Sequence, residues 1–433
     1  MLEVLNTLLW GPGTLALILG TGAWLTLRTG GFPQRNLGRA LALSLGREAR
    51  RKGRGGVSPF GSLMTALAST VGTGNIVGVA AALVSGGPGA LVWMELAAFL
   101  GLAAKFAECM LAVKYRRVRR DGTRWGGPMA VMETRLGSAG AVLGRFYALF
   151  ALLMAFAMGA MAQSGALADT FSAAFTLPRW RVGLVTAALA LTILLGGIRR
   201  IAEISTVLVP VMALLYLGGG LAVILGNLRR LPEALILMLR CAVAPEAALG
   251  GALGIVTRRE ALRWGVARSV FSNEAGLGSA AITAACADTE DPVKQGLISM
   301  TGVFFDTMVI CTVTGLAICC SGTLGTADGA GRPLTGAALT LRAFETVLGP
   351  LAPWLIGVAL GLFAFTSVLG CAVQAETTAS YLLGPEAVRP CRVLYGLAVF
   401  VGAVIPMATV LQLADLANAL MAFPNLVCLL LLS

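Results

Sequence analysis

The chain has 433 residues, of which 57% are hydrophobic and only 12% are charged. An ordinary soluble domain carries about 25% charged residues, so the composition excludes a water-soluble globular enzyme and predicts an all-α polytopic membrane protein. The absence of histidine excludes histidine-dependent triads and histidine-ligated zinc. The nine cysteines show no metal-binding spacing and are interpreted as small apolar residues. The net charge of +12 is typical of basic cytoplasmic loops, so no nucleic acid is expected as a partner.

A membrane-spanning helix needs about 20 apolar residues. The sequence contains about eleven such stretches, near 7–27, 60–84, 88–113, 145–168, 182–198, 202–226, 233–256, 296–321, 351–383, 392–411 and 413–432. Two basic loops, 28–54 and 114–145, hold 16 of the 33 lysines and arginines and lie an even number of spans apart. The positive-inside rule places both loops in the cytoplasm. We therefore expect a multi-pass protein of the cell (inner or plasma) membrane, with its N-terminus outside and its C-terminus cytoplasmic.

The segment 264–286 does not fit this alternation of spans. It has a helical pattern, but Asn273 and Glu274 make it polar in the middle, and such side chains are costly when they face lipid. We expect it to form an amphipathic or partly inserted helix on the cytoplasmic side.

Residues 68–78 interrupt the second span with a polar, glycine-containing run that includes Gly72 and Gly74. Glycine costs up to about 1 kcal/mol relative to alanine in a helix, and Thr70, Thr73 and Asn75 add polarity. This pattern predicts a helix that opens at mid-membrane, where exposed backbone groups need partners that lipid does not offer. Tight packing through the Gly74-to-Gly78 spacing is an alternative, although it leaves the polar residues unexplained. A potassium filter needs four such loops around one axis, and the chain has one.

A second interruption, at 241–251, opens the seventh span with Pro245, Gly250 and Gly251. Broken helices at matching positions of two halves indicate a secondary transporter with an inverted repeat. We predict one transmembrane domain over 1–433, with a peripheral first helix at 1–28, a first repeat at 60–226 and a second repeat at 231–433. An ordinary kink at Pro245 is the alternative.

Eight motifs occur in order along most of the chain, at 65–79, 86–90, 105–109, 114–116, 126–129, 271–280, 295–297 and 363–366. Together they resemble the alanine or glycine:cation symporters of the amino acid, polyamine and organocation superfamily. The resemblance implies the five-plus-five inverted repeat of the bacterial leucine transporter, and sodium-coupled import of a small neutral amino acid such as alanine or glycine. The sequence shows no nucleophile–base pair, metal cluster or nucleotide-binding loop, so no enzymatic activity is expected. Sodium as the coupling ion is the only cofactor that the resemblance implies. Proton coupling, as in some relatives, and a channel or transporter-like sensor without coupled flux are the alternatives.

The same resemblance assigns roles in substrate binding. The amides of Thr73 and Gly74 would bind the carboxylate of the amino acid, because helix-end amides carry partial positive charge. Asn75 and the Thr70 carbonyl would lie near the ammonium group or a cation. Gln163 matches the glutamine of the family pocket; without the family it is a generic interhelical hydrogen-bonding residue.

The resemblance also implies a sodium site made of neutral oxygens, which suit a monovalent cation better than calcium. Its ligands would be the carbonyls of Ala68, Val71 and Phe363 and the hydroxyls of Thr366 and Ser367. For the two hydroxyls, a hydrogen bond to a carbonyl one turn earlier is the alternative.

Three further positions are singled out. Cys371 stands where the family pattern has a pocket-closing tryptophan, so a side chain larger than methyl is expected to fit. Asp306 lies near the middle of a span, where an acidic residue is functional by default, but its partner is not deducible. Glu246, next to Pro245, suggests proton coupling, although a cavity- or surface-exposed carboxylate is simpler.

Overall fold

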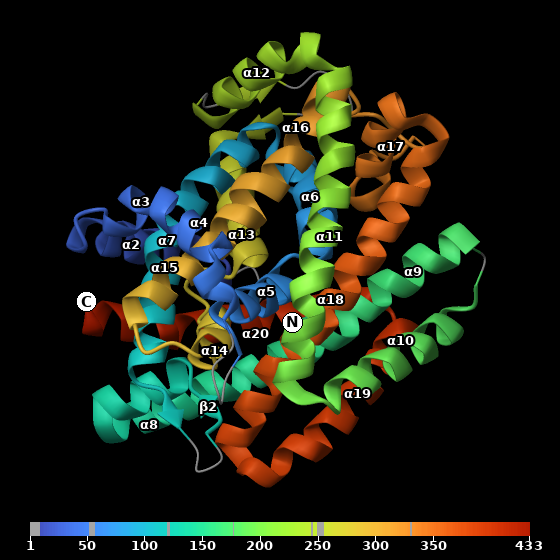
Figure 1. Cartoon of the computed structure of the whole chain (residues 1–433). Coiled ribbons are helices and arrows are strands. Elements are labelled where there is room, and N and C mark those ends of the chain that lie inside the picture. The colour runs from blue at the N-terminus through green and yellow to red at the C-terminus, as the bar shows by residue number, and fades with distance from the viewer. Residues whose placement is uncertain are drawn as a thin grey trace.

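The computed structural model describes residues 9–51, 57–118, 122–175, 177–243, 246–248, 255–329 and 331–433. These residues are almost entirely helical (Figure 1). The α-helices are α2 (Pro12–Arg28), α3 (Phe32–Arg35), α4 (Leu37–Leu45), α5 (Pro59–Thr70), α6 (Val77–Gly86), α7 (Gly89–Lys114), α8 (Pro128–Met154), α9 (Gln163–Phe175), α10 (Arg179–Leu194), α11 (Gly197–Gly226), α12 (Leu231–Val243), α13 (Arg258–Asn273), α14 (Ser279–Ala285), α15 (Pro292–Val303), α16 (Thr312–Ser321), α17 (Gly336–Leu348), α18 (Ala352–Leu383), α19 (Val388–Val404) and α20 (Met407–Leu432). Two short antiparallel hairpins pair β1 (Arg117–Val118) with β2 (Arg124–Trp125), and β3 (Glu246–Ala248) with β4 (Ile255–Thr257).

Within the described residues, seven continuous helical runs are long and apolar enough to cross a membrane, and the bent pair α5–α6 makes an eighth. This confirms a nearly all-helical protein with several helices long and apolar enough to cross a membrane. The expected boundary between the last two spans, near residue 412, is wrong, because the helices separate at Ile405 and Pro406. Proline lacks the amide that would continue the ladder of α19.

The first predicted interruption is confirmed. Helix α5 starts at a Ser58 cap, whose hydroxyl accepts from the Gly61 amide at 3.0 Å, and it ends at Thr70. A 3₁₀ turn, Thr73–Asn75, leads into α6, and the two helices differ in direction by 62°.

A second broken helix lies at 274–278, between α13 and α14. Glu274, Gly276 and Gly278 have φ values of 54°, 86° and 79°, and such left-handed backbone stops a right-handed helix. The expectation of one continuous helix at 264–286, amphipathic or partly inserted, is therefore wrong. Asn273 and Glu274 are 2% and 6% exposed because α13 packs on α6 and α7, which shields the polar break inside the protein.

The seventh span expected at 233–256 is also wrong. Helix α12 has 13 residues, and it buries Ala234, Met238, Cys241 and Ala242 along one face. It is an amphipathic helix that packs against α7, α13 and α16 at one end of the bundle (Figure 1). The break predicted there depends on Pro245, Gly250 and Gly251, which lie outside the described residues.

The two broken helices run in opposite directions. In Figure 1 the chain ascends from α5 to α6 and descends from α13 to α14. Two π-helical segments, 155–162 before α9 and 304–311 before α16, interrupt neighbouring helices, and such segments are frequent at functional sites. Helix α2 packs on α7, α13 and α20. The architecture therefore brings two helix breaks and two π segments together.

Candidate functional site

The first break releases backbone groups at the end of α5. In a continuing helix the Ala68 carbonyl would accept from the Gly72 amide, but this amide donates to Asn75 Oδ1 at 3.0 Å. Likewise the Asn75 amide donates to the Gly72 carbonyl at 3.2 Å instead of to Val71. Ala68 and Val71 are 0% and 1% exposed. Two predicted cation ligands thus lose their helical partners at a buried position, where a partner is needed.

Helix α18 presses against this end of α5. An ideal Cβ on Gly370 would lie 2.4 Å from the Ser69 nitrogen and 2.9 Å from the Ala68 carbonyl carbon, and one on Gly72 would lie 2.7 Å from Ser367 Oγ. Only glycines allow this approach. It brings the predicted ligand Ser367 against Gly72, the residue that follows Val71.

The other α18 residues of the predicted cation site adjoin Ser367. The Phe363 carbonyl accepts from Thr366 Oγ1 at 3.0 Å and from Ser367 Oγ at 2.9 Å. Thr366 Oγ1 also lies 3.2 Å from Met212 Sδ of α11. In this conformation both hydroxyls bond back to their own helix, the alternative considered from the sequence.

The first break also meets α9. Thr73 Oγ1 donates to Gln163 Oε1 at 3.2 Å, and an ideal Cβ on Gly72 would lie 3.4 Å from both Gln163 amide atoms. Gln163 is 3% exposed and directly follows the π-helical segment 155–162. The structure thus brings together Gly72, Thr73, Gln163 and Ser367 from three separate segments.

Asn75 joins the two broken helices through Asp306. Its Nδ2 donates to Asp306 Oδ1 at 2.7 Å and to Ser272 Oγ of α13 at 3.1 Å. Ser272 donates to Asp306 Oδ2 at 2.6 Å, and Thr307 Oγ1 donates to the same oxygen at 3.1 Å. Asn75 and Asp306 are both 0% exposed. The partner of Asp306 is therefore the first break itself, held by neutral donors from α13 and the second π segment.

Gly74 faces α13. An ideal Cβ on Gly74 would meet the Phe271 ring at 3.6 Å, and the guanidinium of Arg268 lies 5.2 Å from the centre of that ring. Arg268 and Phe271 line a cavity of about 160 Å³ together with Trp10, Arg263, Trp264, Ala267 and Asp415. A cavity of about 190 Å³ lies at the other end of the breaks, lined in part by Arg124, Trp125, Glu376 and Arg392.

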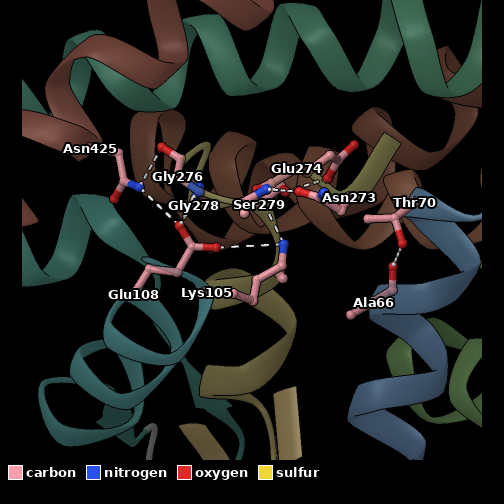
Figure 2. Close-up of polar contacts among 12 residues, drawn as sticks. Ala66, Thr70, Lys105, Glu108, Asn273, Glu274, Gly276, Gly278, Ser279 and Asn425 are labelled. Atoms are coloured by element: carbon pink, nitrogen blue, oxygen red, sulfur yellow. Dashed lines mark hydrogen bonds and ion pairs between the residues drawn. The ribbon is translucent and has the colours of Figure 1, made fainter. Parts of the chain in front are cut away.

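A buried ionic cluster holds the second break (Figure 2). Glu108 Oε2, on α7, accepts from the amides of Gly276 and Gly278 at 3.2 and 3.1 Å and from Asn425 Nδ2 at 3.1 Å. Lys105 Nζ lies 3.6 Å from Glu108 Oε1 and donates to the Glu274 carbonyl at 3.2 Å. These contacts replace the helical bonds that the break gives up.

The sequence prediction of site residues missed this cluster. Lys105 and Glu108 lie in the motif at 105–109, for which the sequence predicts no role. The available signal was their position in an apolar span, since ionisable residues there are functional by default. The contact between Lys105 and the Glu274 carbonyl has no sequence signal, because these two residues are 169 positions apart.

Few of the described contacts of Cys371, Glu246 and Thr70 bear on their predicted roles. Cys371 is 2% exposed; its Sγ lies 4.0 Å from the Ser69 carbonyl, and its Cβ would be 2.2 Å from an ideal Cβ on Gly159. It therefore packs between the end of α5 and the first π segment. Glu246 lies in β3, and its side chain is outside the described part of the structure. Thr70, at the end of α5, donates its hydroxyl to the Ala66 carbonyl at 3.2 Å.

The basic loop after α7 binds the segment between α14 and α15. Arg124 pairs with Asp288 and Glu290, and Arg116 donates to the Ala287 carbonyl at 2.6 Å. Burial lowers the pKa of Arg116. Nearby, Lys294 bonds Glu48 at 2.6 Å and lowers the pKa of that carboxyl.

Across the described ranges, no group of three or more His, Cys, Asp or Glu side chains is arranged to hold a metal ion.

Comparison with known proteins places this geometry in context. The sequence profile of the sodium:alanine symporter family matches residues 1–433. The chain is 43% identical over 431 residues to an uncharacterized transporter of Haemophilus influenzae, covering 99% of this chain and 92% of the relative. It is 41% identical over 438 residues to the sodium/alanine symporter AgcS of Methanococcus maripaludis, covering 100% and 94%. It is 37% identical over 434 residues to the probable sodium/glutamine symporter GlnT of Bacillus subtilis, covering 99% and 87%.

Among solved structures, a manganese transporter of Eremococcus coleocola in complex with an aromatic bis-isothiourea compound is similar in fold. The TM-score is 0.52 at 14% identity, covering 85% of this chain and 75% of the other. This likeness shows a transporter fold and nothing of the substrate. The match over the full length, together with the extent of the identities, shows that the chain belongs to the sodium:alanine symporter family.

Proposed function

We propose that the protein imports a small neutral amino acid, such as alanine or glycine, together with sodium. The observation that carries this proposal is the first break. Its released carbonyls, its amides and the hydroxyl of Ser367 lie within one buried region between α5, α9 and α18. Mid-membrane backbone groups of this kind need partners that lipid cannot provide, and the two solutes of a symporter supply them.

The sodium ion would bind between the carbonyls of Ala68, Val71 and Phe363 and the hydroxyls of Thr366 and Ser367. The close approach of Gly370 to Ser69 and Ala68 supports this placement, because it brings the two sets of oxygens together. When sodium enters, the two hydroxyls would turn from the carbonyls of α18 to the ion. The exchange replaces weak hydrogen bonds within one helix by a shared ligand between two helices.

The amino acid would bind beside the ion, with its carboxylate on the amides of Thr73 and Gly74 at the start of α6. A helix start suits an anion because its amides point outward and carry partial positive charge. Gln163 positions Thr73, and Asn75 fixes the turn through Gly72 and Asp306. The Thr70 carbonyl would lie near the ammonium group. Cys371 would contribute to the side-chain end of the pocket.

Alternating access requires a water path from each side in turn. We infer eleven crossings in a five-plus-five arrangement: α2, α5–α6, α7, α8–α9, α10 and α11, then α13–α14, α15–α16, α18, α19 and α20. The opposite directions of the two broken helices support an inverted repeat. This order leaves the N-terminus outside and the C-terminus in the cytoplasm. The cavity beside Arg268 would then face outward, and the one beside Arg392 would face the cytoplasm.

The experiment that tests the proposal is uptake of labelled amino acids into proteoliposomes. We expect alanine or glycine to accumulate against its gradient when sodium is high outside, and not when potassium replaces sodium. Accumulation driven by a pH gradient alone would favour a proton-coupled symporter. Binding without accumulation under any gradient would favour a sensor or channel and would contradict symport.

A further inference from the structure

The second break contains more buried acid than base. Lys105, Glu108 and Glu274 are 2%, 2% and 6% exposed, and Lys105 is the only base that contacts the two acids within the described residues. Unpaired charges inside a membrane protein are strongly unfavourable. The contacts of each carboxylate therefore indicate which of the two acids is paired with Lys105 and which is neutralised by something else.

Glu108 has the contacts of an anion, with hydrogen bonds to Oε2 and an ion pair, but no hydrogen bond, at Oε1. Its Oε1 faces the Lys105 ammonium at 3.6 Å, and its Oε2 accepts three hydrogen bonds, from Gly276, Gly278 and Asn425. Figure 2 shows the carboxylate pointing at all of these donors. Three hydrogen bonds and one cation are the surroundings of an ionised carboxylate.

Glu274 has different surroundings. Lys105 bonds to its backbone carbonyl, at 3.2 Å. Its carboxylate is hydrogen-bonded to the Ser279 hydroxyl, and no other hydrogen bond to this carboxylate occurs among the described residues. A hydroxyl can accept as well as donate, so Ser279 can pair with either the ionised or the protonated acid.

The remaining titratable groups around Glu274 add no positive charge. They come from three other elements: Asp306 of the second π segment, Tyr147 of α8 and Cys371 of α18. Asp306 is an acid held by neutral donors. The Tyr147 hydroxyl is fully buried, has no hydrogen-bond partner and would lie 2.9 Å from an ideal Cβ on Gly278. The cluster thus keeps a surplus of negative charge and an unpaired polar atom.

We propose that Glu274 is a proton-binding site of the transport cycle, occupied when Glu274 is buried as it is here. This inference rests on the proposed function and extends it to a second cation. A proton fits this site better than sodium does. Sodium needs several oxygen ligands, and the neighbouring Lys105 ammonium repels a metal ion. A proton neutralises the carboxylate without a coordination shell.

The proton leaves when the break moves and water reaches Glu274. The O–H bond of the carboxylic acid breaks, its electron pair stays on the carboxylate, and a water molecule takes the proton. Reclosure of the break buries Glu274 again and requires that a proton return. Glu108 and Lys105 stay paired on α7 throughout, so the change of charge is confined to Glu274.

The test compares Glu274→Gln with wild type in sodium-driven alanine uptake between about pH 6 and about pH 9. We expect wild-type uptake to fall with rising pH, by up to about tenfold per pH unit once Glu274 is mostly ionised. Glu274→Gln imitates the protonated acid and is expected to remain active with a flat profile. Glu274→Asp restores a titrating group and should restore the pH dependence. Glu95→Gln is the matched control, because Glu95 is a half-buried acid on α7 with a Thr312 hydroxyl partner at 2.8 Å; it should keep the wild-type profile.

A wild-type profile in Glu274→Gln, or a flat profile in wild type itself, would overturn the inference. The thermal unfolding temperature of the purified proteins against pH gives a readout that does not depend on transport. We expect the stability of wild type to fall with rising pH relative to Glu274→Gln, starting above the pKa of an exposed glutamate, about 4.3, because the unfolded chain then ionises Glu274 while the folded protein keeps it protonated. This measurement also separates the two proposals. If no amino acid is taken up, the proposed symport is refuted. The proton site is then refuted only if wild type and Glu274→Gln also show the same dependence of stability on pH.

Discussion

The close approach of α18 to α5 at Gly370 makes a sharp test of the sodium site. In Gly370→Ala the new Cβ would lie 2.4 Å from the Ser69 nitrogen and 2.8 Å from Ser69 Cα, about 1 Å short of the 3.4 Å at which ordinary contact begins. The obstructing atoms are backbone, so no side chain can swing away. The two helices must separate by about 1 Å, and the carbonyls of Ala68 and Val71 then move away from Ser367.

The magnitude follows from that separation. Overpacking of a core costs about 1–3 kcal/mol of stability, which a membrane protein with this much buried contact is expected to survive. A displacement of 1 Å in a positioned site costs on the order of a hundredfold. We therefore expect the sodium concentration for half-maximal uptake to rise at least about tenfold in Gly370→Ala. The proposed amino-acid site at the start of α6 depends on contacts other than the one at Gly370. The affinity for the amino acid at saturating sodium should therefore change much less.

The assay is initial alanine uptake into proteoliposomes over a series of sodium concentrations. Gly357→Ala is the matched control, because Gly357 lies on the same helix and an ideal Cβ there has nothing within 4 Å. Folding is checked by membrane insertion and thermal unfolding of both variants. If Gly370→Ala folds and shows the wild-type sodium dependence, sodium does not bind between α5 and α18.

Three further outcomes are expected. Thr366→Val combined with Ser367→Ala should raise the sodium requirement by far more than it weakens substrate binding, because these hydroxyls are the proposed sodium ligands on α18; unchanged sodium dependence would place the ion elsewhere. Gly74→Val should abolish uptake while Gly74→Ala is tolerated, since one Cβ meets the Phe271 ring at an ordinary 3.6 Å and a branched side chain does not fit; equal uptake by both would refute the contact. In Cys371→Trp the indole would project beside the end of α5. In competition assays on the folded variant, the set of amino acids that inhibit uptake should narrow toward glycine and alanine. Identical inhibition profiles of the two proteins, from glycine to leucine, would show that Cys371 does not line the pocket.

The position of the first break could be predicted from the sequence, because its cause is local. Gly72, Thr73, Gly74 and Asn75 follow one another in an apolar run, and adjacent residues determine where a helix loses its backbone bonds. The family and the all-helical membrane fold were likewise visible, since motif order and apolar length need no tertiary information. The break between Asn273 and Gly278 has the same kind of local signal. It was misread because a polar segment was assigned to the membrane surface, whereas α6 and α7 bury it.

The partners of the buried charges were decided only by the tertiary structure. Asn75 and Asp306 are 231 positions apart, and Lys105 meets Glu274 across 169 positions. Nothing in the neighbourhood of either acid identifies its partner, because a hydrogen bond between helices depends on how the helices pack and rotate. The chain by itself thus determines where its backbone opens. Packing determines which distant side chains close that opening, since a buried charge is stable only where the folded protein places a donor or a cation within reach.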